Sequence, residues 1–385
     1  MYQSDTKAPL RLGFIGGGLS SAVGQVHYSA SAMDGCWVLS AGAFSRDQEV
    51  NRNTALQWGV EPSRAYDCWR KMIKCEKHNL DAVAVLVPTP MHAEVVQELL
   101  AQGVPVICEK SLVNTVEELQ LIKSAYEKDK HYLAVTYNYS GYPMVRELKS
   151  MIESGELGRI KQFHFEMPQE GFVRPPMIAG KAAPPQSWRL QDSYIPMVSH
   201  DLGMHLHHLS SFLLSQEPEQ VMAEYSSYSP YHDLIDTVFM WLRYADGMKG
   251  SFWFTKSALG NRNGMRIRIY GDKASAEWIQ VEPESLKVCR ADGTINLIDR
   301  GGPVKVASDL RYNRMKAGHP SGFVEAFANL YQDLHSSISA HQQGHVAQDS
   351  AFVSDWIHAA SGMALFQAAS NSNKTGAWEM IRSAV

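Results

Sequence analysis

The sequence predicts a two-domain protein, in which a doubly wound α/β domain precedes an α+β domain with a large, mostly antiparallel, open sheet. Three observations support this prediction. The 385 residues exceed the usual length of one domain. Apolar runs alternate with helical patterns over the first 140 residues, and half-buried strand patterns separated by turns follow. We expect a first domain over 1–140 and a second over 141–385, whose C-terminal helices can pack back on the first.

In the first domain, short continuous apolar runs indicate strands that are buried on both faces. These runs are LRLGFI (10–15), WVLSAGAF (37–44), DAVAVLVP (81–88), PVICEK (105–110) and YLAVTY (132–137). Helical patterns lie between them at 48–58, 67–75, 91–102 and 115–129. Strands that alternate with helices over short connections predict a parallel sheet with helices on both faces.

In the second domain, the pattern changes to alternating or aromatic runs. After a helix expected at 199–214, such runs occur at 219–229, 235–244, 248–256, 265–270, 274–281 and 285–289. Turn signals such as Ala245-Asp246-Gly247 separate these runs and indicate antiparallel connections. Helices are expected near 320–341 and 348–371, and the Pro- and Gly-rich stretch 171–187 predicts a long loop.

The composition restricts the partners and the location that we expect. Hydrophobic residues make up 45% of the chain and charged residues 20%, with a formal net charge of −4, so charge gives no reason to expect nucleic acid or an anionic membrane. No apolar run reaches the roughly 18 residues of a membrane span. The N-terminus lacks the features of a secretory leader, and none of the five cysteines forms a CxxC pair. We expect a cytoplasmic protein that binds neither nucleic acid nor membrane.

A glycine-rich turn follows the first predicted strand, in LRLGFIGGGLSSAVGQVH. Glycine there permits a tight turn and lets the backbone approach a pyrophosphate, which the N–H groups of the next helix stabilise. Gly16 and Gly18 fit the pattern G-x-G-x-x-G, whereas Ser21 occupies the third glycine position. Ala22 or Gly24 then supplies the small contact. The context predicts a Rossmann dinucleotide site; the alternative is a glycine-rich turn without a ligand.

The end of the second predicted strand, AGAFSRD, bears on the choice of nucleotide. NAD-binding proteins place Asp or Glu there for the ribose 2′-hydroxyl, whereas here Ser45 and Arg46 offer groups that suit a 2′-phosphate. We therefore expect NADP, with NAD as the alternative. In that alternative, Ser45 caps the next helix through its spacing to Gln48 and Arg46 packs on the adenine. Asp47 then reaches the ribose.

Five further motifs carry a family resemblance. They are AFSRD (43–47), VPTPMHAE (87–94), CEKS (108–111), LGRIKQFHFE (157–166) and HDLGMH (200–205). With the glycine turn, they resemble the Gfo/Idh/MocA oxidoreductases, named for glucose-fructose oxidoreductase, inositol 2-dehydrogenase and MocA. The resemblance implies a Rossmann domain followed by an α+β domain whose open sheet often forms a subunit interface. It also implies reversible NAD(P)-dependent oxidation of a sugar or cyclitol hydroxyl.

The resemblance also assigns roles to single residues. Lys110 is expected near the reacting hydroxyl, although Ser111 replaces the proline of the family's Glu-Lys-Pro. Asp201 and His205 match the family's D-x-x-x-H, so we expect Lys110, Asp201 and His205 to be catalytic. The residues expected at the cofactor are Gly16, Gly18, Leu19, Ser45, Arg46, Pro88, Thr89, His92, Glu109 and Lys110. Those expected at the substrate are Asn138, Tyr139, Trp188, Arg189 and His208, with packing or loop anchoring as the alternative for the first four.

The chemistry of hydroxyl oxidation supports the same catalytic residues. A base must remove the hydroxyl proton as the hydride leaves, and histidine titrates nearest to neutral pH. A carboxylate four residues before His205 lies on the same helical face, where it binds the substrate or orients the imidazole. A nearby lysine favours an alkoxide-like transition state and lowers the pKa of the histidine.

The histidine-rich stretch 200–208 also permits other interpretations. Asp201, His205 and His208 share a helical face at spacings that zinc ligands can use. However, a nicotinamide cofactor supplies its own hydride acceptor, so proton transfer needs no metal. We expect proton transfer and no metal; a metal site and a buried, hydrogen-bonded core histidine are the alternatives.

The overall prediction is an oxidoreductase for a sugar, sugar derivative or inositol. One alternative is an enzyme that retains NAD and uses transient oxidation, as a glycosidase or dehydratase does. Another is a nucleotide-binding regulator, but such a protein would be expected to lack Lys110 or His205. We also expect a homodimer or homotetramer joined through an exposed apolar sheet face. That face is predicted from Phe239, Trp241, Phe252, Trp253 and Phe254; the alternative is that the closing helices cover it.

Overall fold

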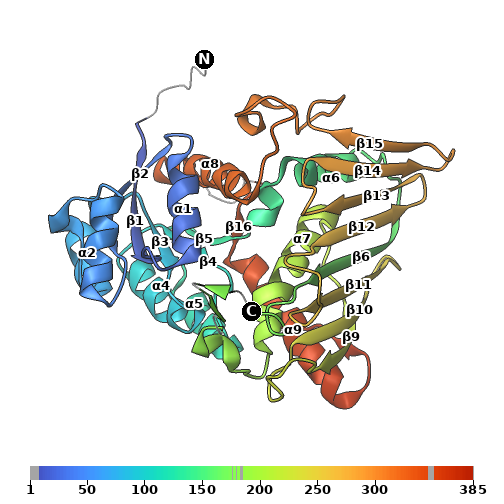
Figure 1. Cartoon of the computed structure of the whole chain (residues 1–385), viewed down its shortest axis with the longest axis horizontal. Helices are drawn as coiled ribbons and strands as arrows, with labels where there is room; N and C mark the ends of the chain where they lie inside the picture. Colours follow the sequence, from blue (N-terminus) through green and yellow to red (C-terminus); the bar gives the residue numbers. More distant parts are fainter. Residues whose placement is uncertain (1–7, 176, 179, 183–184, 346–350, 385) are drawn as a thin grey trace. The chain divides into compact units, whose positions relative to one another are not determined.

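The computed structural model describes residues 8–175, 177–178, 180–182, 185–345 and 351–384, which form two compact units (Figure 1). The first unit contains the chain up to Gly141 together with Phe323–Ile357, and the second contains Tyr142–Gly322 and His358–Ala384. Over the residues that the structure describes, the chain therefore passes between the units three times. None of the described helices is long and apolar enough to cross a membrane.

The first unit is built on a parallel sheet, as the apolar runs predict. Its strands are β1 (Leu10–Gly16), β2 (Trp37–Ala43), β3 (Ala82–Leu86), β4 (Val106–Glu109) and β5 (Leu133–Thr136). The spatial order is β5-β4-β3-β1-β2, and the short β16 (Ser354–Asp355) pairs antiparallel with β5 at the edge. Because β2 lies on one side of β1, and β3, which follows β2 in the chain, lies on the other side, the order reverses beside β1. Ligands of such sheets bind at this point, outside the carboxyl ends of the strands.

Helices cover this sheet. They are α1 (Ala22–Ala32), α2 (Gln48–Gln57), α3 (Trp69–Glu76), α4 (His92–Ala101), α5 (Val116–Ala125) and α8 (Phe323–Gln342). Thr115 and Glu118 form the predicted capping box at the start of α5. Although α8 comes late in the chain, it packs against α1 in the first unit. Its Phe327 and Tyr331 belong to the same hydrophobic core as Leu12 and Phe14 of β1.

The second unit contains the predicted open sheet, with nine strands. In spatial order they are β15 (Ile295–Asp299), β14 (Ser285–Arg290), β13 (Ala274–Ile279), β12 (Arg266–Gly271), β6 (Ile160–Pro168), β11 (Lys249–Thr255), β10 (Thr237–Arg243), β9 (Gln220–Ser226) and β17 (Glu379–Met380). Within this described sheet, only β6 and β11 run parallel to each other, and the other neighbouring strands are antiparallel. The mostly antiparallel sheet is thereby confirmed.

One face of this sheet is covered by α6 (Pro143–Glu153), α7 (Met204–Leu214) and α9 (Trp356–Thr375), as Figure 1 shows. The helix expected at 348–371 begins later than predicted, at Trp356, and positions 348–350 lie outside the described residues. The long loop predicted at 171–187 contains a short hairpin of β7 (Met177–Ile178) and β8 (Lys181–Ala182).

The prediction that five aromatic residues of β10 and β11 share one exposed face is wrong. Side chains alternate between the two faces of a strand, so Trp253 cannot lie on the same face as its neighbours Phe252 and Phe254. The structure buries Phe252 and Phe254. The opposite face carries Trp253 beside Phe239, together with Trp241, and the last two are 41% and 57% exposed.

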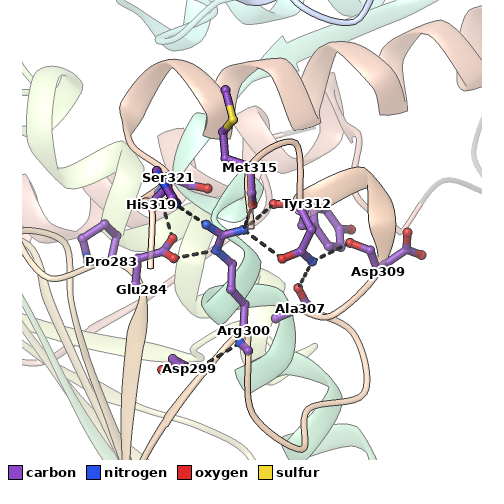
Figure 2. A network of polar contacts seen from close by, with 12 residues as sticks. Pro283, Glu284, Asp299, Arg300, Ala307, Asp309, Tyr312, Met315, His319 and Ser321 are labelled. Carbon is purple, nitrogen blue, oxygen red and sulfur yellow. Dashed lines mark hydrogen bonds and ion pairs between the residues drawn. The ribbon is translucent and has the colours of Figure 1, made fainter. Parts of the chain in front are cut away.

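A buried arginine fixes the segment that precedes α8. Arg300 follows β15, and its Nε donates to Glu284 Oε2 at 2.5 Å. Its remaining nitrogens donate to the carbonyls of Tyr312, Met315 and His319 and to the Asn313 side chain (Figure 2). One guanidinium thus holds the last residues of the second unit before the chain enters α8.

Candidate active site

The glycine turn after β1 has the close backbone contacts that its sequence predicts. Gly16 and Gly17 adopt φ values of +82° and +72°, which favour glycine. A Cβ on Gly24 would lie 1.7 Å from the carbonyl oxygen of Gly17, so Gly24 supplies the small contact that the third glycine usually makes. Ser21 instead caps α1, where its Oγ accepts from the Gly24 N–H at 3.2 Å.

Two amides of this turn are already bonded within the protein. The Gly18 N–H donates to the carbonyl of Phe44 at 3.1 Å, and the Leu19 N–H donates to Thr54 Oγ1 at 3.1 Å. These bonds hold the turn against the end of β2 and the helix that follows. Gly18 and Leu19 therefore shape the turn, and the N–H groups of Ala22 and Val23, which precede the capped Gly24 N–H in α1, are the natural donors for an anion.

At the end of β2, Ser45 does not cap the next helix, as one alternative for this segment had supposed. The cap of α2 is Asp47, whose Oδ1 accepts from the N–H groups of Glu49 and Val50 at 2.9 and 3.0 Å. Ser45 Oγ accepts from the Asp47 N–H at 3.1 Å. Asp47 is thus engaged with its own helix, and the exposed side chain of Arg46 is the charged group nearest the end of the strand.

The loop after β3 is tied to the segment after β4 by His92. Its ring nitrogens lie 2.7 Å from the Ser111 carbonyl and 2.8 Å from the Val87 carbonyl. Burial lowers the pKa of His92, so the neutral ring donates to one of these oxygens. In the same loop, Thr89 is buried and Pro88 is exposed. His92, which we predicted at the cofactor, thus joins the backbone that follows two neighbouring strands, β3 and β4, at the carboxyl edge of the sheet.

A chain of buried polar side chains begins at Glu109, the residue before Lys110. Glu109 Oε1 is 3.0 Å from His27 Nε2 of α1, and His27 Nδ1 is 2.7 Å from the hydroxyl of Tyr331 in α8. Thr136 Oγ1 also donates to Glu109. Burial alone would raise the pKa of Glu109, but the bond and charge of His27 and the Thr136 bond hold it below its ordinary value. Sequence reasoning missed His27 and Tyr331.

Two residues predicted at the substrate are buried after β5. Asn138 and Tyr139 lie in the 3-10 helix Asn138–Gly141. The Tyr139 ring packs against Phe323, with centroids 6.3 Å apart. Asn138 Nδ2 is buried and has no hydrogen-bond acceptor among the described atoms. The packing role that we kept as an alternative therefore has direct support for Tyr139.

In the second unit, Asp201 lies in a π-helical turn, Ser199–Gly203, that leads into α7. Its Oδ2 is 2.8 Å from Arg189 Nη1 and 2.6 Å from Lys256 Nζ. Arg189 also stacks over the ring of Trp188, 4.5 Å from its centroid. Arg189, predicted to bind substrate, is therefore anchored to the predicted catalytic carboxylate. Lys256 follows β11 and has no motif around it that would have identified it.

The other histidines of α7 have separate environments. His207 Nε2 is 2.9 Å from Glu217 Oε2. Burial raises the pKa of Glu217, but the charge and hydrogen bond of His207 and the hydrogen bond from Ser211 lower it to about 2. His208 stacks on Phe212, and burial, with His358 and its histidine neighbours, holds its pKa well below the ordinary value. Within the described ranges, no three His, Cys, Asp or Glu side chains are arranged to hold a metal ion.

These features define a class of protein: a dinucleotide-binding domain followed in the chain by an α+β domain that carries a carboxylate and a histidine one helical turn apart. Residues 10–137 match the model of the oxidoreductase family with an NAD-binding Rossmann fold, and residues 145–277 match that of the GFO/IDH/MocA C-terminal domain. The chain belongs to the Gfo/Idh/MocA family of oxidoreductases, which confirms the resemblance in the sequence.

Similar proteins agree with this assignment. An uncharacterized oxidoreductase of Bacillus subtilis is 30% identical over 340 residues, covering 86% of each chain. Levoglucosan dehydrogenase of Pseudarthrobacter phenanthrenivorans is 27% identical over 312 residues, covering 73% of this chain and 76% of its own. The crystal structure of an inositol dehydrogenase homolog from Azotobacter vinelandii, complexed with NADH and myo-inositol, has a TM-score of 0.86 and 29% identity, with 97% of each chain covered.

Proposed function

We propose that the protein is a nicotinamide-dependent dehydrogenase that oxidises a secondary hydroxyl of a cyclic polyol or a sugar, with His205 as the base. The observation that carries this proposal is the carboxylate of Asp201, which two cations hold one helical turn before His205. Such a carboxylate can orient both an imidazole and a substrate hydroxyl. His205 accepts the hydroxyl proton, and Lys110 stabilises the developing negative charge on oxygen.

The glycine turn fits a dinucleotide. A Cβ on Gly16 would lie 2.8 Å from the backbone of Leu86, and Gly24 tolerates no side chain against Gly17. The turn and the start of α1 would hold the pyrophosphate, and the bound nicotinamide would supply the hydride acceptor. The names of the solved relatives support an inositol or sugar substrate.

The proposed reaction is tested by following nicotinamide absorbance with inositols, aldoses, linear polyols and levoglucosan, each with NAD⁺ and NADP⁺. We expect cyclic polyols or sugars to be oxidised and linear polyols to react less well. Absence of activity across the whole panel would contradict a free dehydrogenase. Nicotinamide released only on denaturation would favour the alternative of an enzyme that retains its cofactor.

For the cofactor, we propose NADP on the basis of the exposed Arg46 and the engagement of Asp47 with its own helix. NAD is the alternative, because the solved relatives contain NADH or NAD⁺. If Arg46 binds a 2′-phosphate, Arg46→Ala should weaken NADP binding by about 1.5–3 kcal/mol and leave NAD binding nearly unchanged. Equal effects on both nucleotides, measured by fluorescence titration, would contradict the preference for NADP.

We also propose a homo-oligomer joined through the outer face of β10 and β11. The exposed rings of Phe239 and Trp241 support it, since a contiguous apolar sheet face usually marks an interface. A monomer mass by light scattering at micromolar concentration would contradict this proposal.

A further inference from the structure

We infer that Lys256 is a positioning residue for the Asp201–His205 pair, and that it sets how strongly His205 binds a proton. This inference depends on the proposed role of His205 as the base. It assigns a function to a residue that neither the motif nor the resemblance includes.

The contacts of Lys256 fix its ammonium group from several sides. Its Nζ lies 2.6 Å from Asp201 Oδ2, 3.2 Å from Gln169 Oε1 and 5.6 Å from the centroid of the Phe172 ring. A lysine ammonium has three N–H donors, so two hydrogen bonds and one ring account for its three directions. The residue as a whole is only 9% exposed. A lysine with these contacts is held in place and is not placed to bind a substrate directly.

The backbone around Lys256 is equally constrained. Its N–H donates to the carbonyl of Asp236 at 2.9 Å, and its own carbonyl accepts from the Phe172 N–H at 3.0 Å. The second cation on Asp201, Arg189, comes from the short 3-10 helix Ser187–Leu190, and its side chain is more exposed than that of Lys256. Lys256 is therefore the more rigid of the two partners, because it extends from the end of a strand in the middle of a sheet.

The charges around His205 determine the expected effect. Asp201 lies one turn before it, and Arg189 and Lys256 bind that carboxylate. His208 of the same helix interacts electrostatically with His205, and also with His358 of α9. Removing the Lys256 charge leaves the negative charge of Asp201 less compensated. A less compensated carboxylate favours the imidazolium form, so the pKa of His205 should rise. Asp201 should also lose its fixed orientation, which lowers the rate.

A matched control exists in the same unit. Lys149 is also 9% exposed, and its Nζ bonds the Phe212 carbonyl at 2.7 Å and Glu153 at 2.8 Å, with the Phe212 ring 4.9 Å away. Lys149→Met therefore removes a lysine of equal burial. Like Lys256, Lys149 contacts a carboxylate, an uncharged oxygen and an aromatic ring. The substitution leaves Asp201 with both of its cations.

The test compares Lys256→Met, Lys256→Arg and Lys149→Met in the full-length holoenzyme. Lys256→Met should lower kcat by about 10- to 100-fold, as expected for a mispositioned catalytic group. It should also raise the pKa of the basic group in the pH profile by roughly 0.5–1 unit. Lys256→Arg should restore most of the profile, and Lys149→Met should leave it unchanged. Both methionine variants should lower the melting temperature to a similar extent.

A second measurement separates this inference from the proposed reaction. The pKa of His205 is read directly by NMR of histidine-labelled protein, with the signal assigned by its loss in His205→Asn. A rise in the pKa of His205 in Lys256→Met but not in Lys149→Met supports the inference even if no tested substrate is oxidised. Absence of oxidation would count against the proposed reaction alone. An unchanged pKa of His205 in Lys256→Met, or the same loss of activity in both methionine variants, would overturn the inference.

Discussion

Replacing His27 by phenylalanine should destabilise the first unit in a pH-dependent way. The ring position suits phenylalanine, because His27 already packs edge-on against Phe327 at 4.9 Å. The substitution removes the bond from His27 Nε2 to Glu109, which is worth about 1.5–3 kcal/mol because its acceptor is charged. It also leaves the buried Tyr331 hydroxyl without its hydrogen-bond partner on α1, at a cost of about 1–3 kcal/mol. We expect a total loss of about 3–5 kcal/mol at pH 7.

The sign of the pH dependence follows from Glu109. Its pKa is lowered in the folded protein, so its interactions stabilise the fold above the pKa of the unfolded chain. That stabilisation is lost as the pH falls through the lowered folded pKa. Without His27, burial of the carboxylate is less well compensated, and protonation costs the variant less. The difference between wild type and His27→Phe should therefore be largest at pH 7 and shrink below about pH 4.

Urea denaturation at pH 7 and at about pH 3 measures this difference. Glu109→Gln is the control background, because a neutral amide replaces the carboxylate while keeping an acceptor oxygen. In that background, His27→Phe should cost nearly the same at both pH values. A cost that is independent of pH in the presence of Glu109 would refute the argument that His27 stabilises an ionised carboxylate.

Two further outcomes are expected. His205→Asn should retain nucleotide binding and the fold while lowering kcat by roughly 10²- to 10⁴-fold, the usual contribution of general acid–base catalysis. Steady-state kinetics together with unchanged nucleotide affinity would establish this result. A loss of kcat below tenfold would remove His205 from the mechanism. Arg300→Met should destabilise the second unit by about 3–5 kcal/mol, because Glu284 and three carbonyls lose a buried partner. Thermal unfolding measures this loss, and a cost below about 1 kcal/mol would show that the loop before α8 is held by other contacts.

The sequence predicts the parallel sheet well because strands buried on both faces are continuous apolar runs. Its five strands begin and end within two residues of their predicted limits. The edge strand β15 was missed for a physical reason: its Ile295 and Leu297 are 65% and 73% exposed, so no alternation of buried and exposed residues marks it. The central strand β6 was also missed. Its alternation is nevertheless visible, because Phe163 and Phe165 are buried between more exposed neighbours.

The candidate site is predictable only where it is local in sequence. The glycine turn and the spacing from Asp201 to His205 are each contained in one short segment, and sequence spacing indicates their geometry. The chain from Glu109 through His27 to Tyr331 joins three elements that only folding brings together. The contact of Lys256 with Asp201 likewise depends on how the end of β11 meets the π-helical turn. Single histidines and lysines outside motifs carry no signal of such contacts.

In the histidine-rich stretch 200–208, three side chains have separate sets of contacts. Asp201 is held by two cations, His207 is paired with Glu217, and His208 is stacked on Phe212. A divalent ion at Asp201 would have to displace or approach the charges of Arg189 and Lys256, which repel it. These contacts favour proton transfer over metal ligation at His205. We therefore expect a chelator to leave the activity unchanged, and inactivation by a chelator with rescue by zinc would contradict this account of the helix.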